Sequence, residues 1–126
     1  MKFTERNRTR KMPNKYHNKK VTYNGITFDS RKEATRYQEL ILLQRAGEIH
    51  SLELQKEFEL IPAVYDCING KKGKCLERAV KYKADFVYRD KDNFLIVEDV
   101  KGHRTKEYIL KRKMMLFLKG IRIVEK

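Results

Sequence analysis

Two aspartates and a lysine in the second half of the chain are spaced as a divalent-metal site would require. Asp85 lies in one stretch of β-forming residues, and Asp99, Val100 and Lys101 end the next such stretch. Because side chains alternate along a strand, Asp99 and Lys101 should face the same side. Mg²⁺ and Mn²⁺ prefer oxygen ligands such as carboxylates, with water and substrate phosphate completing the shell. The spacing therefore predicts a Mg²⁺ or Mn²⁺ site beside a lysine that could assist phosphodiester hydrolysis.

A β-hairpin is needed to bring these residues together. Residues 79–88 and 94–100 are rich in β-branched and aromatic types and are separated by a short polar segment. Antiparallel counting across that segment places Asp85 opposite Val97 or Glu98, close to the second aspartate. Two carboxylates this close repel each other, and a bound cation would compensate them.

An ordinary ion pair between Asp99 and Lys101 is the alternative. At a surface such a pair is worth at most about 1 kcal/mol, and in a chain with 37% charged residues an isolated Asp-x-Lys is weak evidence. Residues 94–97 are continuously apolar, however, which predicts a strand covered on both faces. Charged residues at the end of such a strand indicate a cleft.

Positive charge is concentrated at the two ends of the chain. The formal net charge is +13, of which residues 1–20 and 101–126 each carry +7 and residues 21–100 carry −1. This distribution is typical of a polyanion binder, and DNA is the partner we expect. We expect a flexible basic arm over residues 1–20 and a single domain over residues 21–126. The residues of the arm expected to bind nucleic acid are Arg8, Arg10, Lys11, Lys15, Lys19 and Lys20.

Composition argues against several other classes of protein. The apolar runs are short and no apolar leader is visible, so we expect a cytoplasmic protein with no membrane partner and no organic cofactor. Cys67 and Cys75 lack the spacing of zinc ligands and are expected to be free thiols. His17, His50 and His103 are also not spaced as ligands.

The expected elements form an α/β pattern. They are a small hairpin over 21–28, a helix over 30–46, a strand over 52–60, a flexible turn over 64–78, the hairpin over 79–100, a helix over 105–119 and a strand over 121–124. The residues expected to pack are Ala34, Tyr37, Leu40, Ile41 and Leu43 on the first helix, and Tyr108, Leu110, Met114, Phe117 and Leu118 on the second, with the methionines and Leu116 more typical of core than of a binding stripe. This order predicts a mixed central sheet flanked by helices.

Glu33 has two interpretations. Ser30 and Glu33 have the spacing of a capping box, in which the glutamate satisfies an amide at the start of the helix. In the other interpretation, Glu33 binds the same cation as Asp85 and Asp99. The residues alone favour the cap.

Taken together, these segments resemble the successive motifs of the PD-(D/E)XK nuclease superfamily, as found in small phage-encoded members. The segments are Phe28–Glu33, Leu54-Gln55, Tyr82–Phe86 and Val97–Gly102. The resemblance implies a restriction-endonuclease-like αβββαβ core and a Mg²⁺-dependent DNA endonuclease. It implies that Asp85, Asp99 and Glu33 are catalytic metal ligands, that Val100 binds the metal through its carbonyl, and that Lys101 is the catalytic lysine. One departure is Ala84, where the name-giving motif has proline.

Further positions follow from the same resemblance. Gln55 resembles an auxiliary active-site glutamine, and Glu98 is expected to be structural or to support the site. On and before the second helix, Arg104, Tyr108 and Lys111 are candidates for contacts with the DNA backbone.

Three functions stay open on the sequence. The first is an endonuclease acting on branched, recombination or replication DNA, resembling Holliday-junction resolvases, whose homodimers cut symmetrically. The second is a nuclease-fold DNA-binding or accessory protein without catalysis, and the third is a small basic RNA-binding protein. The preferred DNA structure and the biological pathway cannot be read from the residues.

Overall fold

The computed structural model describes residues 19–100 and 103–126. The chain divides after Glu39 into two compact units, a short N-terminal unit and a larger C-terminal unit. The expected single domain over residues 21–126 stays a prediction, and so does the basic arm, most of which lies outside the described residues. Of the helices in the described segments, none is long and apolar enough to cross a membrane.

The N-terminal unit begins with a small hairpin of β1 (Val21–Tyr23) and β2 (Ile26–Phe28), as predicted. Asn24 and Gly25 both have positive φ, 55° and 77°, which a tight hairpin turn requires. The Phe28 ring packs on Tyr37, with ring centroids 5.1 Å apart.

Helix α2 (Arg31–Arg45) starts and stops where its sequence predicts. The Ser30 hydroxyl accepts a hydrogen bond from the N–H of Glu33 at 3.1 Å, which is the N-cap bond. Gly47 ends the helix with φ 80°. Ala34, Tyr37 and Leu40 are buried, which confirms the predicted apolar face.

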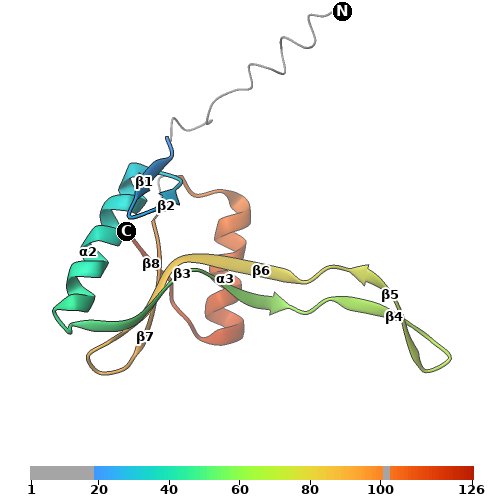
Figure 1. The fold of residues 1–126 in the computed structure, drawn as a ribbon. Coiled ribbons are helices and arrows are strands. Elements are labelled where there is room, and N and C mark those ends of the chain that lie inside the picture. Colours follow the sequence, from blue (N-terminus) through green and yellow to red (C-terminus); the bar gives the residue numbers. More distant parts are fainter. Residues whose placement is uncertain (1–18, 101–102) are drawn as a thin grey trace, which may run out of the picture. The chain divides into compact units, whose positions relative to one another are not determined.

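A four-stranded mixed sheet forms the centre of the C-terminal unit (Figure 1). Its order is β3 (Ile49–Ile61), β6 (Val80–Asp90), β7 (Leu95–Asp99) and β8 (Val124–Glu125). The β3–β6 and β6–β7 pairs are antiparallel and the β7–β8 pair is parallel. The expected α/β fold with a mixed central sheet and two helices is confirmed.

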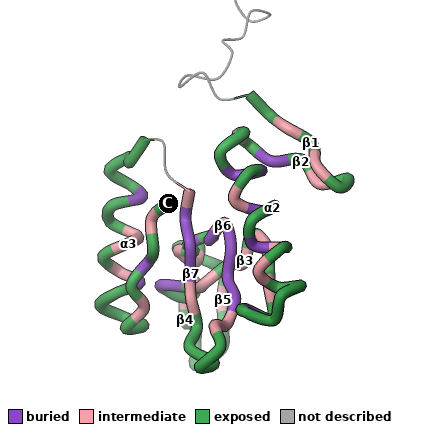
Figure 2. Tube along the Cα trace, turned by 90° about the vertical axis from the view of Figure 1, so that its left-hand side faces the viewer, coloured by how far each residue is buried: buried purple, intermediate pink, exposed green. Residues whose placement is uncertain are grey.

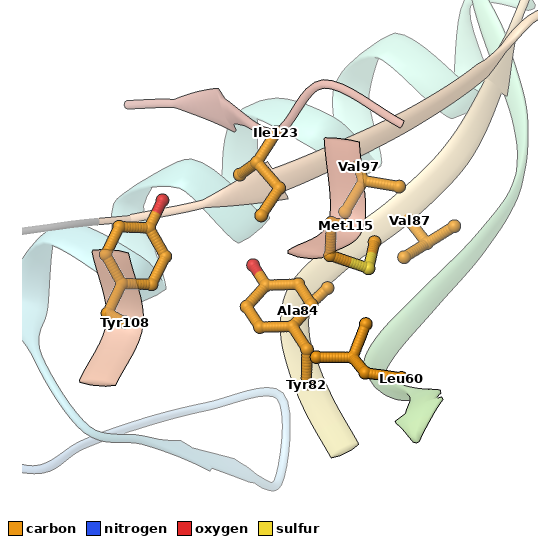
Figure 3. Close-up of a cluster of buried hydrophobic side chains, with 8 residues drawn as sticks. All are labelled: Leu60, Tyr82, Ala84, Val87, Val97, Tyr108, Met115 and Ile123. Carbon is orange, nitrogen blue, oxygen red and sulfur yellow. The ribbon is translucent and has the colours of Figure 1, made fainter. Parts of the chain in front are cut away.

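Helix α3 (Lys106–Lys119) packs on β3 and β6. Thr105 caps its start and Gly120, at φ 67°, ends it, both as predicted. The buried residues of α3 are Tyr108 and Met115, which lie two turns apart and join the core cluster. Figure 3 shows that cluster, which consists of Leu60, Tyr82, Ala84, Val87, Val97, Tyr108, Met115 and Ile123.

Part of the predicted packing on α3 is wrong. Leu110, Leu116, Phe117 and Leu118 are 57%, 54%, 83% and 49% exposed. The helix carries apolar residues over more than one stripe, and periodicity alone does not show which stripe meets the sheet. The stripe of Tyr108 does so.

Residues 64–78 are not a flexible turn. They form a second hairpin, the β4–β5 ribbon, made of β4 (Val64–Ile68) and β5 (Lys71–Glu77). Asn69 and Gly70 turn the chain with φ values of 52° and 74°. The glycines and lysines suggested a loop, but an Asn-Gly turn between short strands is also a hairpin signal.

Candidate active site

The pairing of β6 with β7 brings Asp85 and Asp99 level with each other. Phe86 pairs with Glu98. The same antiparallel register, continued by one residue, puts Asp85 opposite Asp99. The Asp85 carboxylate accepts a hydrogen bond from the backbone N–H of Val100 at 2.8 Å. Asp85 is therefore held against the residue that follows Asp99.

This register differs from the predicted one. Asp85 was expected opposite Val97 or Glu98, and that pairing is wrong by one or two positions. The cause is the turn, because β6 continues to Asp90, whose N–H donates to the carbonyl of Phe94 at 3.1 Å. The longer strand moves the two aspartates closer together than predicted.

Burial increases steeply along β7 (Figure 2). Phe94 and Leu95 are 66% and 38% exposed, so the expectation that residues 94–97 are covered on both faces is wrong at the turn end. Glu98 and Asp99, in contrast, are 0% and 3% exposed. Carboxylates this deeply buried need hydrogen bonds or a cation to compensate for lost hydration.

Two tyrosines bind these acids. Tyr82 donates its hydroxyl hydrogen to Asp99 at 2.5 Å, and Tyr88 donates to Glu98. Burial raises the pKa of Tyr82, and the hydrogen bond to Asp99 and its negative charge raise it further, so the hydroxyl stays protonated and remains a donor. Adjacent residues of a strand face opposite sides, so Glu98 and Asp99 belong to different surroundings.

Gln55 reaches the same place from β3. Its side-chain amide donates to the other oxygen of Asp85 at 3.4 Å. Gln55 also has φ 55° in the middle of a strand, an unusual backbone conformation that costs about 1–3 kcal/mol and is often found at functional sites. The structure thus brings together Gln55, Asp85, Asp99 and the backbone of Val100.

A family model described as "Protein of unknown function (DUF1064)" matches residues 13–121. The chain belongs to the DUF1064 family. No curated protein and no solved structure matches this DUF1064 chain. The family description states no activity.

Five of the other predicted residues lie outside the part of the chain that the structure describes. They are Lys101, Arg8, Arg10, Lys11 and Lys15. Glu33 is on α2 in the N-terminal unit and is 6% exposed. Lys19 is exposed, and Lys20 forms an ion pair with Asp29 at 3.1 Å. No group of three or more His, Cys, Asp or Glu side chains positioned to hold a metal occurs among the described residues.

Glu125 on β8 organises the basic residues near Asp99, with which it pairs in the parallel β7–β8 register. Its carboxylate accepts hydrogen bonds from Arg104 at 2.8 and 3.0 Å, from the Tyr108 hydroxyl at 2.6 Å and from Arg112 at 2.9 Å. Lys111 forms an ion pair with Glu107 at 3.1 Å. Contacts of Arg104, Tyr108 and Lys111 with DNA stay a prediction, but these side chains also have intramolecular roles.

The Glu125 network makes stability pH-dependent. Hydrogen bonds from Arg104 and then Tyr108 lower the pKa of Glu125 to about 2 from an ordinary value of 4.5. A lowered pKa contributes stability that is fully present above the unfolded value and is lost as pH falls from 4.5 toward about 2. We expect Glu125→Gln to lower the free energy of unfolding at pH 7, measured by urea denaturation, and to approach wild type near pH 2. An equal difference at both pH values would contradict this role.

Proposed function

We propose that this protein is a metal-dependent DNA endonuclease. The observation that carries the proposal is the meeting of Asp85 and Asp99 at adjacent strand positions, with Asp85 held by Val100 N–H and Gln55. The order α2, β3, β6, β7, α3, β8 also agrees with an αβββαβ core, if the β4–β5 ribbon is treated as an insertion. The resemblance to PD-(D/E)XK nucleases and the net charge of +13 support a DNA substrate.

The donor set suits Mg²⁺ or Mn²⁺. Two carboxylates and the carbonyl of Val100 are hard oxygen ligands, which these cations prefer over nitrogen or sulfur. A bound cation would polarise the scissile phosphate and lower the pKa of a water molecule. The site is too polar and too buried at Asp99 to be explained as an exposed ion pair.

The chain's own residues would position these ligands. Val100 N–H and the Gln55 amide fix the two oxygens of Asp85, and the Tyr82 hydroxyl fixes one oxygen of Asp99. Each donor orients a carboxylate oxygen that could also contact a cation. Lys101 would orient the attacking water or offset the charge that develops on the phosphate.

Cleavage with and without divalent metal tests the proposal. Purified protein is incubated with linear duplex, single-stranded and four-way-junction DNA in Mg²⁺ and in EDTA. We expect cleavage in Mg²⁺ alone, and comparison of the junction with a matched duplex identifies the preferred DNA structure. Equal cleavage in EDTA would exclude the metal mechanism.

A second candidate is a nuclease-fold DNA-binding protein without catalysis. It is favoured by one observation, namely that Asp99 and Glu98 each accept a hydrogen bond from a tyrosine and so have partners within the protein. Calorimetric titration with Mg²⁺ separates the candidates. A binding protein should show no Mg²⁺ site that depends on Asp85.

Glu33→Gln distinguishes the cap from the ligand. Glutamine also satisfies a capping box, so the substitution should change the free energy of unfolding by less than about 0.5 kcal/mol. If Glu33 binds the cation, Mg²⁺-dependent cleavage should fall by about 100-fold, since metal-site contacts are worth several kcal/mol.

Ser30→Ala is the matched control for this test. Loss of the bond from Ser30 to the N–H of Glu33 should cost about 1 kcal/mol of stability and leave cleavage unchanged. If Glu33→Gln cleaves at the wild-type rate, Glu33 serves only the helix.

A further inference from the structure

The β4–β5 ribbon extends beyond the β3–β6 pair as a two-stranded arm (Figure 1). Its two strands make their principal contacts with each other. Val64, Tyr65, Ile68 and Leu76 are 47%, 42%, 57% and 52% exposed, so neither face of the ribbon is covered. An isolated two-stranded ribbon is at best marginally stable in water. The apolar side chains of the ribbon therefore do not serve the described core and are available to a partner.

Three lysines give the end of the ribbon its charge. Lys71, Lys72 and Lys74 are exposed, and residues 67–76 contain no acid. None of the three forms an ion pair with another described residue. Lys72 Nζ lies 3.9 Å from the centre of the Tyr65 ring, a cation–π contact that brings no carboxylate to the ammonium group.

The stem of the ribbon is different. Lys56 and Lys81 on β3 and β6 lie 3.4 and 3.7 Å from Glu53 and Glu57. Lys56 and Lys81 of the stem are thus paired with acids, whereas the three ribbon lysines are not. Three exposed lysines without a carboxylate partner among the described residues, on a narrow projection, suit a dense row of anions.

We propose that the β4–β5 ribbon enters the major groove of duplex DNA and places Lys71, Lys72 and Lys74 on the flanking phosphates. The groove is about 12 Å wide and admits a two-stranded ribbon. Duplex DNA carries about one phosphate per 1.7 Å of axis, so all three ammonium groups can be matched. The exposed apolar side chains can contact thymine methyl groups in the same groove. This inference rests on the proposed function, because it takes DNA as the substrate.

Salt-dependent binding tests the ribbon without requiring cleavage. The variant K71A/K72A/K74A is compared with K56A/K81A/K91A, in which the lysines are paired with Glu53, Glu57 and Glu48. Both variants lower the formal net charge from +13 to +10. Fluorescence anisotropy in EDTA measures affinity for a short duplex at several salt concentrations.

We expect the ribbon variant to bind duplex at least roughly tenfold more weakly at about 0.1 M salt, and its slope of log K against log salt to fall by about 2 to 3. The paired-lysine variant should change much less, and K71R/K72R/K74R should restore the slope. If both variants lost the same affinity for duplex DNA, the effect would come from total charge alone, and the proposal would be overturned. An equal loss on single-stranded DNA would overturn placement in the groove.

Alkylation of the wild-type protein gives an independent readout. Both cysteines of the chain, Cys67 and Cys75, lie in the ribbon as exposed free thiols, as predicted for these residues. Duplex DNA should slow their reaction with iodoacetamide in EDTA, and unchanged rates at saturating DNA would contradict the proposal. If duplex DNA bound and protected the cysteines but was not cleaved in Mg²⁺, the proposed endonuclease function would be rejected and the proposed binding of the ribbon to DNA would stand. If the protein cleaved DNA in Mg²⁺ and the K71A/K72A/K74A variant bound duplex DNA as tightly as wild type, the proposed role of the ribbon would be rejected and the endonuclease function would stand.

Discussion

Asp99→Asn is expected to reduce Mg²⁺-dependent DNA cleavage by about 1000-fold, because a metal contact contributes several kcal/mol and each 1.36 kcal/mol is tenfold in rate. The substitution removes a charge and keeps the shape. The asparagine carbonyl can still accept the hydrogen bond that Asp99 now accepts from Tyr82. Single-turnover cleavage with saturating enzyme measures the chemical step, and circular dichroism checks the fold.

Asp92→Asn is the matched control for Asp99. Asp92 is exposed in the turn between β6 and β7, so the substitution removes the same charge from the same hairpin. Its cleavage rate should equal that of wild type. Equal rates for all three proteins would show that Asp99 is a structural acid, bound by Tyr82 for stability alone.

Lys101→Ala is expected to lower the cleavage rate by roughly 100- to 1000-fold, as loss of one preorganised charge at a developing anion does. Affinity for Mg²⁺, measured by calorimetry, should stay within error of wild type, because lysine is not a ligand. Lys101→Arg should not restore the rate, since the planar guanidinium differs from an ammonium in shape and hydration.

Lys106→Ala supplies the comparison for Lys101. Lys106 is exposed at the start of α3 and its loss changes the net charge equally. A wild-type rate for Lys101→Ala would remove the catalytic lysine from the mechanism.

Local signals predicted most of the elements. Helix α2 begins after Ser30 and ends before Gly47, and α3 begins after Thr105 and ends at Gly120. These boundaries were predictable because N-caps and glycines with positive φ depend on only a few neighbouring residues. The final strand was predicted over 121–124 but is short and comes later, at Val124–Glu125. Its position depends on pairing with β7, which is a long-range contact.

The site was predictable as far as its hairpin. Alternation and turn counting brought Asp85 near Asp99, but the register needed the true end of β6. Tyr82 was missed because it is three residues from Asp85 and simple alternation puts the two on opposite faces. Ala84 and Val87 are three residues apart, so regular alternation of side chains would put them on opposite faces of the sheet. Both belong to the same core cluster, so the alternation is interrupted between them. Gln55 has its positive φ directly across from this interruption, and no local rule predicts that.

Glu125 shows the same limit. It is one of two acids in residues 101–126, which was visible in the sequence, but only the parallel β7–β8 pairing places it beside Asp99. Its bonds to Arg104 and Tyr108 give these two predicted DNA contacts a structural role as well. Counting charges identified the C-terminal end of the chain as basic, but it did not show that Glu125 pairs with basic residues there.

Cleavage of one labelled four-way junction by wild type and Asp99→Asn, each in Mg²⁺ and in EDTA, tests the central claim most directly. The proposed endonuclease predicts product only for wild type in Mg²⁺, with DNA binding retained in the other three reactions. Product in EDTA, or equal product from both proteins in Mg²⁺, would contradict a metal site built on Asp85 and Asp99.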